Sequence, residues 1–311
     1  MHAITSDSLS KTYRSGIIRK QHVPALVGFS IEVDPGQIFG LLGPNGAGKT
    51  TFIKILLSIT HPSSGEASIL GTKLPSVHVR KRIGYLPENH RYPGYLTGEQ
   101  LLKFFGRLSA VSSQVLQQRI PSLLQLVGMD QWRTMKVKKY SKGMLQRLGL
   151  AQSLINDPEV LFLDEPTDGV DPVGRKEIRD VLTNLKKQGK TIFLNSHLLS
   201  EVELISDRVA ILDKGKLLKT GTVDELTATS SLYHIGITGA VPENLRHEAS
   251  AMLMKLQVES DSMIAEMNST GELNKLIDLL RKYQVEITSI VQKRSSLEDS
   301  FINLIKREIP S

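Results

Sequence analysis

A segment of eight residues near the N-terminus has the residue types and the spacing of a phosphate-binding loop. It fits the pattern G-x-x-x-x-G-K-[ST] at every fixed position. Glycines let successive backbone N–H groups point at phosphate oxygens, the lysine reaches the β- and γ-phosphates, and the hydroxyl completes a Mg²⁺ shell. We therefore expect Thr50 to be a metal ligand and a nucleotide to be bound by Gly43, Pro44, Asn45, Gly46, Ala47, Gly48, Lys49, Thr50 and Thr51.

Two adjacent acids follow a short apolar run further along the chain. Residues 161–163 are Leu-Phe-Leu, and Asp164 and Glu165 come directly after them. Carboxylates at the carboxyl end of a buried parallel strand lie where such sheets bind ligands. We expect Asp164 to hold Mg²⁺, directly or through water, and Glu165 to polarise the attacking water as general base. Such a pair is common by itself, and the phosphate-binding loop makes it specific.

A histidine follows a third apolar run. His197 comes after residues 191–194, which are Thr-Ile-Phe-Leu. A lone histidine is more often a structural residue than a ligand. Its place at another strand end, where the ligands of parallel sheets collect, favours a contact with the γ-phosphate. Both interpretations stay open on the sequence alone.

A parallel sheet would bring these groups together. Apolar runs predict buried strands over residues 38–42, 160–163 and 191–194, and the glycine-rich turn leads into a helix over residues 51–56. Near-continuous apolar strands of this kind indicate an α/β fold with a parallel sheet covered on both faces. Helix-period spacing indicates a helical subdomain at about residues 89–155.

The remainder of the chain is expected to form a small α+β domain over residues 232–311, after an α/β domain over residues 1–226. The threonine- and serine-rich residues 227–231 are typical of a linker. The predicted elements are a helix carrying Leu273, Leu276, Ile277 and Leu280, a half-buried strand carrying Val285, Ile287 and Val291, and a helix carrying Leu297, Phe301, Leu304 and Ile305.

Composition excludes several classes of protein. Of 311 residues, 40% are hydrophobic and 23% charged, close to the globular average, so disorder and fibrous structure are excluded. No apolar run approaches the length of a membrane-spanning helix, and the N-terminus lacks the apolar core of a signal peptide. The absence of cysteine suits a reducing cytosol. The net charge of +7 and the short clusters at 79–82 and 136–139 favour a solvated basic surface over a nucleic-acid groove.

Taken together, these residues resemble the ATP-binding cassette (ABC) family over about residues 3–225. Residues 140–147, Tyr-Ser-Lys-Gly-Met-Leu-Gln-Arg, resemble the signature segment of that family. They depart from its commonest form, L-S-G-G-Q, at Tyr140, Lys142 and Met144. They keep Ser141 and Gly143, which offer a hydroxyl and a bare backbone N–H to a phosphate at a helix N-terminus.

The resemblance implies further roles by position. Tyr13 is similar to the aromatic residue that stacks on adenine, although local packing in a strand would also explain it. Glu88 occupies the place of the usual glutamine, where it can take Mg²⁺ or orient water but adds a negative charge beside the triphosphate. Asp171 matches the dimer-contact loop, and His197 matches the switch histidine.

The resemblance also implies a fold and a function. The fold would be that of a P-loop NTPase of ABC type, with a mostly parallel core sheet, an antiparallel β subdomain and a helical subdomain. The chain would bind ATP and Mg²⁺ and hydrolyse ATP as the motor of a transporter, exporter type being favoured. Its partners would be a polytopic membrane subunit and, in the ATP state, a second copy or a close relative.

The motor would then be cytoplasmic and lie on the inner face of the cell membrane through its partner. The alternative is a soluble ABC ATPase acting on ribosomes or nucleic acid. One phosphate-binding loop and the lack of a sustained heptad run argue against it. The presence of Lys49, Asp164 and Glu165 argues against a binding module without catalysis. A phosphotransferase would not need Ser141, Gly143 or the loop at Asp171.

Overall fold

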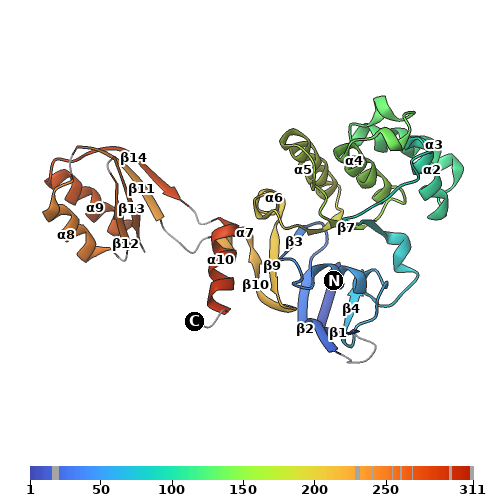
Figure 1. The fold of residues 1–311 in the computed structure, drawn as a ribbon, viewed down its shortest axis with the longest axis horizontal. Helices are drawn as coiled ribbons and strands as arrows, with labels where there is room; N and C mark the ends of the chain where they lie inside the picture. Colours follow the sequence, from blue (N-terminus) through green and yellow to red (C-terminus); the bar gives the residue numbers. More distant parts are fainter. Residues whose placement is uncertain are drawn as a thin grey trace. The chain divides into compact units, whose positions relative to one another are not determined.

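The computed structural model describes residues 1–15, 21–227, 232–239, 241–253, 255–259, 261–267, 269–293 and 296–308. The chain divides into two compact units, Met1–Gly221 and Thr222–Ser311, and Figure 1 draws both. Of the predicted linker, residues 228–231 lie outside the described residues, and Thr227 is the last residue of helix α7 (Val223–Thr227). No helix among the described residues has the length and apolar character needed to cross a membrane.

A six-stranded sheet forms the centre of the first unit. Strands β3, β7 and β8 are buried at every position, as their apolar sequences predict, and the pairs from β9 through β3, β8 and β7 to β6 are parallel. The order across the sheet is β10 (Lys216–Thr222), β9 (Arg208–Asp213), β3 (Ile38–Leu42), β8 (Thr191–Asn195), β7 (Val160–Asp164) and β6 (Ile83–Leu86).

Phenylalanine rings join this sheet to the helix that follows the phosphate-binding loop, α1 (Lys49–Leu56). Phe193 of β8 lies 5.7 Å, centroid to centroid, from each of Phe39, Phe52 and Phe162. All four are fully buried. Close packing of this kind fixes the carboxyl ends of the strands relative to the start of α1. Helices α5 (Pro172–Lys187) and α6 (Leu199–Ile205) follow β7 and β8 in the chain.

A second, antiparallel sheet belongs to the same unit. Its order is β2 (Gln21–Val33), β1 (Ile4–Ser15), β4 (Ser64–Ile69) and β5 (Thr72–Lys73). Phe29 of β2 meets Phe52 of α1 edge to face, with centroids 4.7 Å apart, so the two sheets share one hydrophobic core. This sheet is the antiparallel β subdomain that the family resemblance implies.

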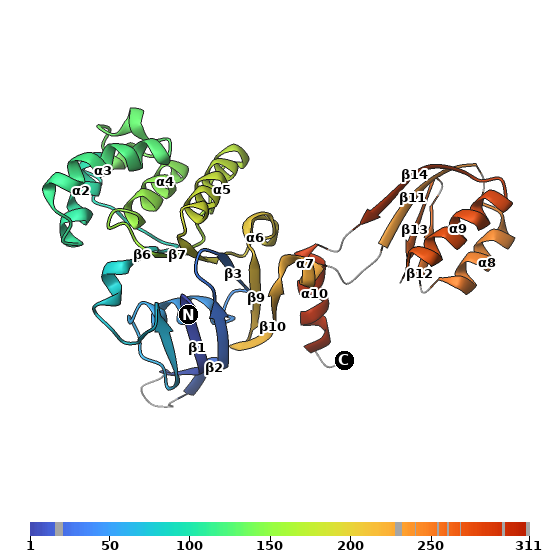
Figure 2. The ribbon, with the colours of Figure 1, turned by 180° about the vertical axis from the view of Figure 1, so that it is seen from behind.

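Three helices form the predicted helical subdomain. They are α2 (Gly98–Leu108), α3 (Ser113–Leu126) and α4 (Lys142–Ser153), with the short 3₁₀ turns η2 (Asp130–Trp132) and η3 (Val137–Lys139); another 3₁₀ turn, η1 (Val79–Arg82), precedes β6. Figure 2 shows α2, α3 and α4 lying together, away from the antiparallel sheet. Each begins at a hydroxyl cap, as Thr97, Ser112 and Ser141 accept a backbone N–H of the first turn.

The second unit contains a four-stranded antiparallel sheet packed against two helices. The strand order is β12 (Lys255–Val258), β13 (Ser262–Glu266), β11 (Leu232–Thr238) and β14 (Glu286–Lys293), and the helices are α8 (Glu243–Met252) and α9 (Thr270–Lys282). A last helix, α10 (Leu297–Glu308), packs on α7, where the Ser300 hydroxyl donates to the Leu226 carbonyl at 2.6 Å.

One detail of the strand predicted around residues 285–291 is wrong. Val285 is buried and Ile287 packs on the core, but Val291 is 57% exposed. The pairing of β14 with β11 shifts register between Ile287 and Ser289. A bulge of this kind inserts one extra residue, so side chains beyond it switch to the other face of the sheet.

Candidate functional site

A pocket of about 390 Å³ lies at the carboxyl ends of β3, β7 and β8. It collects most of the residues that the sequence singles out, although they come from four separate stretches of chain. The lining consists of Ala25, Asn45, Gly46, Ala47, Gly48, Lys49, Thr50, Thr51, Glu88, Asp164, Glu165, Asn195 and His197.

The phosphate-binding loop curls tightly between β3 and α1. Gly48 has φ +112°, and a Cβ built there would lie 2.2 Å from the Ala25 carbonyl oxygen, so the loop can close this way only with glycine. Gly48 is also the N-cap of α1 and offers no side chain to its first N–H groups. These N–H groups and the positive end of α1 make a site for an anion.

Lys49 lies inside this loop. The side chain is buried, and its ammonium donates to the carbonyls of Gly43 at 2.6 Å and Pro44 at 3.2 Å. Burial lowers the pKa of Lys49, while Glu165, Asp164 and Glu88 act in the opposite direction. The loop thus holds a preformed cation beside three carboxylates.

Asp164 is the most deeply buried of these acids, at 1% exposure. Its Oδ1 accepts from the Asn195 amide, and burial raises its pKa to about 6, with further contributions from Glu88 and Glu165. The side-chain oxygen of Asn195 is buried and has no hydrogen-bond partner among the described residues. A carboxylate that is costly to ionise and an acceptor without a donor both fit a cation bound beside β7 and β8.

Hydrogen bonds fix both the backbone and the carboxylate of Glu165. Its φ is +53°, an unusual conformation for a residue other than glycine. The backbone is fixed by Asn195, whose carbonyl accepts the Glu165 N–H at 2.8 Å, and by Gln146, whose amide donates to the Glu165 carbonyl at 2.8 Å. The carboxylate accepts from the Ser196 hydroxyl at 3.1 Å and from the backbone N–H of His197 at 2.9 Å. This backbone strain is sustained by a network around a carboxylate that faces the pocket.

His197 reaches the same carboxylate through its ring. Its Nδ1 lies 2.9 Å from Glu165 Oε1, and the side chain is half exposed. His197 therefore fits both interpretations: it has a structural contact with Glu165, and it also lines the pocket.

The pocket offers the hard oxygen donors that Mg²⁺ prefers, a hydroxyl from Thr50 and a carboxylate from Asp164. Within the described stretches, no three histidine or acidic side chains converge as a metal site of their own. Mg²⁺ in nucleotide sites is held by one or two protein ligands together with phosphates, so this donor set fits the ion.

Glu88 should weaken nucleotide binding through its charge. It is exposed, lines the pocket and raises the pKa of Asp164. We expect Glu88→Gln to tighten ATP binding about two- to fivefold, because it removes a partly screened negative charge. Nucleotide titrations at low and high salt measure this, and the gain should shrink at high salt. An equal or weaker affinity at both salt concentrations contradicts the expectation.

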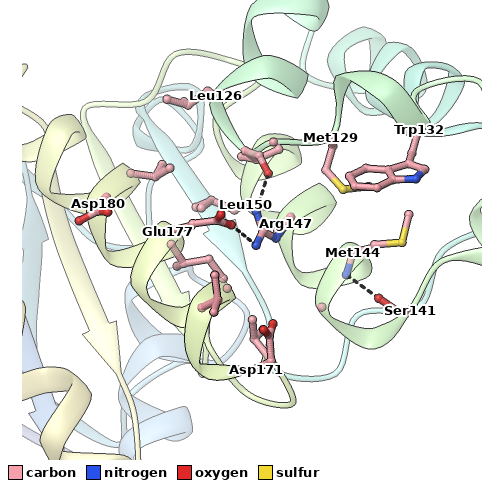
Figure 3. A pocket seen from close by; sticks show the side chains of 18 of the residues that line it. Leu126, Met129, Trp132, Ser141, Met144, Arg147, Leu150, Asp171, Glu177 and Asp180 are labelled. Atoms are coloured by element: carbon pink, nitrogen blue, oxygen red, sulfur yellow. Dashed lines mark hydrogen bonds and ion pairs between the residues drawn. The ribbon is translucent and has the colours of Figure 1, made fainter.

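Six predicted site residues do not line this pocket. Gly43 and Pro44 belong to the phosphate-binding loop, where their carbonyls accept from Lys49. Tyr13 of β1 is 38% exposed, opposite Val23, and the Lys11 ammonium lies 5.1 Å from its ring centroid. Ser141, Gly143 and Asp171 line a different pocket, of about 630 Å³, between α4 and the start of α5 (Figure 3). Their assigned roles in nucleotide binding stay predictions.

Sequence reasoning assigned no role to Asn195, Ser196 or Gln146. Asn195 and Ser196 end the third strand run, where the signal was a polar side chain at a parallel strand end. Gln146 lies 19 residues before Glu165, and no spacing rule connects the two.

Comparison with known proteins points in one direction. Residues 26–168 match the family model described as ABC transporter. The chain is 43% identical to an uncharacterised ABC transporter ATP-binding protein of Synechocystis sp., over 96% of this chain and 83% of the relative. It is 35% identical to the Nod factor export ATP-binding protein I of Burkholderia lata, over 91% and 92% of the two chains. It is 33% identical to a daunorubicin resistance ATP-binding protein of Streptomyces coeruleorubidus, over 97% and 95%.

Solved structures agree with this likeness. The ATP-binding subunit of an ABC transporter superposes with a TM-score of 0.64 at 28% identity, covering 73% of this chain and 92% of that one. A dimeric ATP-binding cassette in a post-hydrolysis state with ADP and phosphate gives a TM-score of 0.65 at 22% identity, covering 70% and 98%. The second likeness is one of fold.

Proposed function

Because this chain belongs to the ATP-binding cassette (ABC) transporter family and is an ATPase of that type, we propose that it is the motor subunit of an exporter, coupling ATP-driven dimer closure to movement of a separate membrane subunit. The observation that carries the proposal is the convergence of Lys49, Asp164 and Glu165 on one pocket at the carboxyl ends of β3 and β7. The export and drug-resistance names of two relatives support the exporter type. The names of the three relatives described above concern transport, export and drug resistance, and none refers to ribosomes or nucleic acid.

The side chains of the pocket divide the chemistry among them. Lys49 and the N–H groups at the start of α1 bind the phosphates of ATP. Glu165 accepts a proton from the attacking water, and Ser196 and His197 orient its carboxylate through the contacts described above. Thr50 and Asp164 hold Mg²⁺, whose charge, when it is bound, offsets that of the phosphates. The products are ADP and phosphate.

A second subunit would complete the site. Ser141 and Gly143 begin α4 in a pocket separate from the one that contains Lys49. In a head-to-tail dimer each signature segment serves the nucleotide of the other subunit, so that two helix N-termini meet one γ-phosphate. The partner is a second copy or a close relative.

The helical subdomain offers a surface for the membrane subunit. A groove of about 650 Å³ lies beside β6, α2 and α4. Of the described residues that line it, Arg80, Lys81 and Arg91 are cationic and none is Asp or Glu. Leu108 at the end of α2 also lines it and is 68% exposed. We assign this groove to a cytoplasmic segment of the membrane subunit, which would hold the motor on the inner face of the membrane.

The test is an affinity pull-down of the chain from detergent-solubilised membranes of its source. A stoichiometric polytopic membrane protein supports the motor function. Recovery of ribosomes or DNA, or of no membrane protein at all, refutes it. The remaining domain assignments, an ATPase domain over residues 1–226 and an extension over 232–311, belong to the same proposal.

Leu108→Glu should lower the amount of membrane protein recovered in the pull-down at least about tenfold, because a charge would be buried in the contact. ATP binding by the isolated chain should stay unchanged. Leu204→Glu on α6 is a matched control, since that leucine is 65% exposed and also lies on a helix. Equal recovery with both variants contradicts the assignment of the groove.

A further inference from the structure

Lys142 is one of the three residues, with Tyr140 and Met144, at which the signature segment departs from the commonest family form. It is the first residue of α4, and its ammonium lies 2.7 Å from the Asp168 carboxylate. Asp168 belongs to residues 165–171, which connect β7 to α5 and begin with Glu165. The ion pair also lowers the pKa of Asp168.

Helix stability does not explain a lysine at this position. The N-terminus of a helix carries the positive end of its dipole, which disfavours a cation in the first turn. Lys142 occupies the first helical position after the Ser141 cap. The Asp168 carboxylate offsets this repulsion, so the lysine and the aspartate depend on each other.

The path of the lysine side chain is narrow. It passes directly over Gly169, where a Cβ would lie 2.2 Å from the lysine Cδ and 2.7 Å from its Nζ. Gly169 also has φ +68°. The loop therefore accommodates the lysine through a residue that has no side chain, and Lys142 lies along the loop even though 63% of it is exposed.

Two further residues of α4 contact the start of this loop and the elements beside it. One turn along, the buried amide of Gln146 donates to the Glu165 carbonyl at 2.8 Å. Arg147 forms an ion pair with Glu177 of α5 and donates to the Val127 carbonyl at the end of α3 (Figure 3). The first turns of α4 thus contact the loop of the general base at its first residue, Glu165, and at Asp168 in its middle.

We propose that Lys142 is a positioning residue that couples the two nucleotide sites of the dimer. This rests on the proposed head-to-tail arrangement, in which Ser141 and Gly143 serve the partner's nucleotide while Glu165 serves its own. The Lys142–Asp168 pair joins these two segments within one subunit. A displacement of residues 165–171 at one site is then passed to the signature segment that acts at the other.

A double-mutant cycle tests the coupling, with Lys142→Met, Asp168→Asn and the double variant. ATP-induced dimerisation is measured in a Glu165→Gln background, and hydrolysis in the otherwise unchanged chain. Each single variant should raise the ATP concentration for half-maximal dimerisation about two- to fivefold, the range of an exposed ion pair. The double variant should need no higher an ATP concentration for half-maximal dimerisation than the more strongly affected single variant. The Hill coefficient should fall, and kcat at saturating ATP should stay within about twofold.

Two controls separate positioning from general damage. Lys142→Arg should restore near-normal dimerisation, because arginine can still pair with Asp168. Lys73→Met removes an ion pair of a similarly exposed lysine, with Glu66 at 2.5 Å in the antiparallel sheet, and should change nothing. Additive effects of the two substitutions, or dimerisation unaffected by either, overturn the coupling alone. A Glu165→Gln chain that stays monomeric overturns the head-to-tail dimer and the coupling together.

Discussion

Glu165→Gln is expected to lower kcat about a thousandfold while ATP affinity changes little, within the range of 10²–10⁴ that a positioned general base contributes. Glutamine has the same shape: its oxygen can accept from the His197 N–H and its amide nitrogen can donate to the Ser196 hydroxyl, but it cannot accept the proton of the attacking water. Single-turnover hydrolysis and equilibrium nucleotide binding measure the two quantities separately.

The same variant should accumulate as an ATP-bound dimer, because closure continues while hydrolysis is stopped. Size-exclusion chromatography with saturating ATP and Mg²⁺ detects this, and omission of Mg²⁺ is the control. More than about a tenth of normal kcat would place the general base elsewhere, since that loss is far below the range for such a residue. A monomer under these conditions argues against the dimer.

Asp164→Asn should have two opposite effects: greater stability of the ligand-free chain and loss of hydrolysis. Burial raises the pKa of Asp164 to about 6, above its ordinary value of 3.8. The folded state therefore resists ionisation of this group, so stability falls as the pH rises from about 4 to about 6 and the cost is complete above that. The gap between the two pKa values corresponds to on the order of 3 kcal/mol.

Asparagine removes the charge and keeps an oxygen to accept from Asn195. Urea unfolding of both chains between pH 4 and 8 should show the variant more stable at pH 7.5, with the difference vanishing near pH 4. Asp157→Asn is the control of opposite sign, because the hydrogen bond from Lys190 lowers the pKa of Asp157. A variant that is less stable at neutral pH contradicts the account of Asp164, and retained hydrolysis contradicts its role.

The family, the fold class and most residues of the pocket that contains Lys49 could be predicted because their determinants are local. The octapeptide around Lys49 must have its glycines and lysine at fixed spacing, and the buried strands must be apolar throughout, so both are visible in a single sequence. The comparisons confirm the family, and the solved cassettes confirm the fold class.

What could not be predicted depends on contacts between distant residues or on backbone geometry. Asp168 lies 26 residues from Lys142, and no sequence pattern predicts that the two side chains form an ion pair. The left-handed conformation of Glu165 is imposed by tertiary hydrogen bonds, since nothing in its residue type favours it. Val291 fits strand alternation, but the bulge at Ile287 reverses the face on which it lies.

The hydrogen bonds from Lys49 to Gly43 and Pro44 determine which anions can bind in the loop, since an anion must replace them. An ammonium that already donates to two carbonyls gains, on binding an anion, only the difference in hydrogen-bond free energy between the anion and those carbonyls. A weakly charged anion offers little difference, whereas oxygens bearing the full charge of a triphosphate offer a large one. Lys49 would thus make the loop selective for highly charged ligands, so that it binds a nucleoside triphosphate in preference to small anions of lower charge.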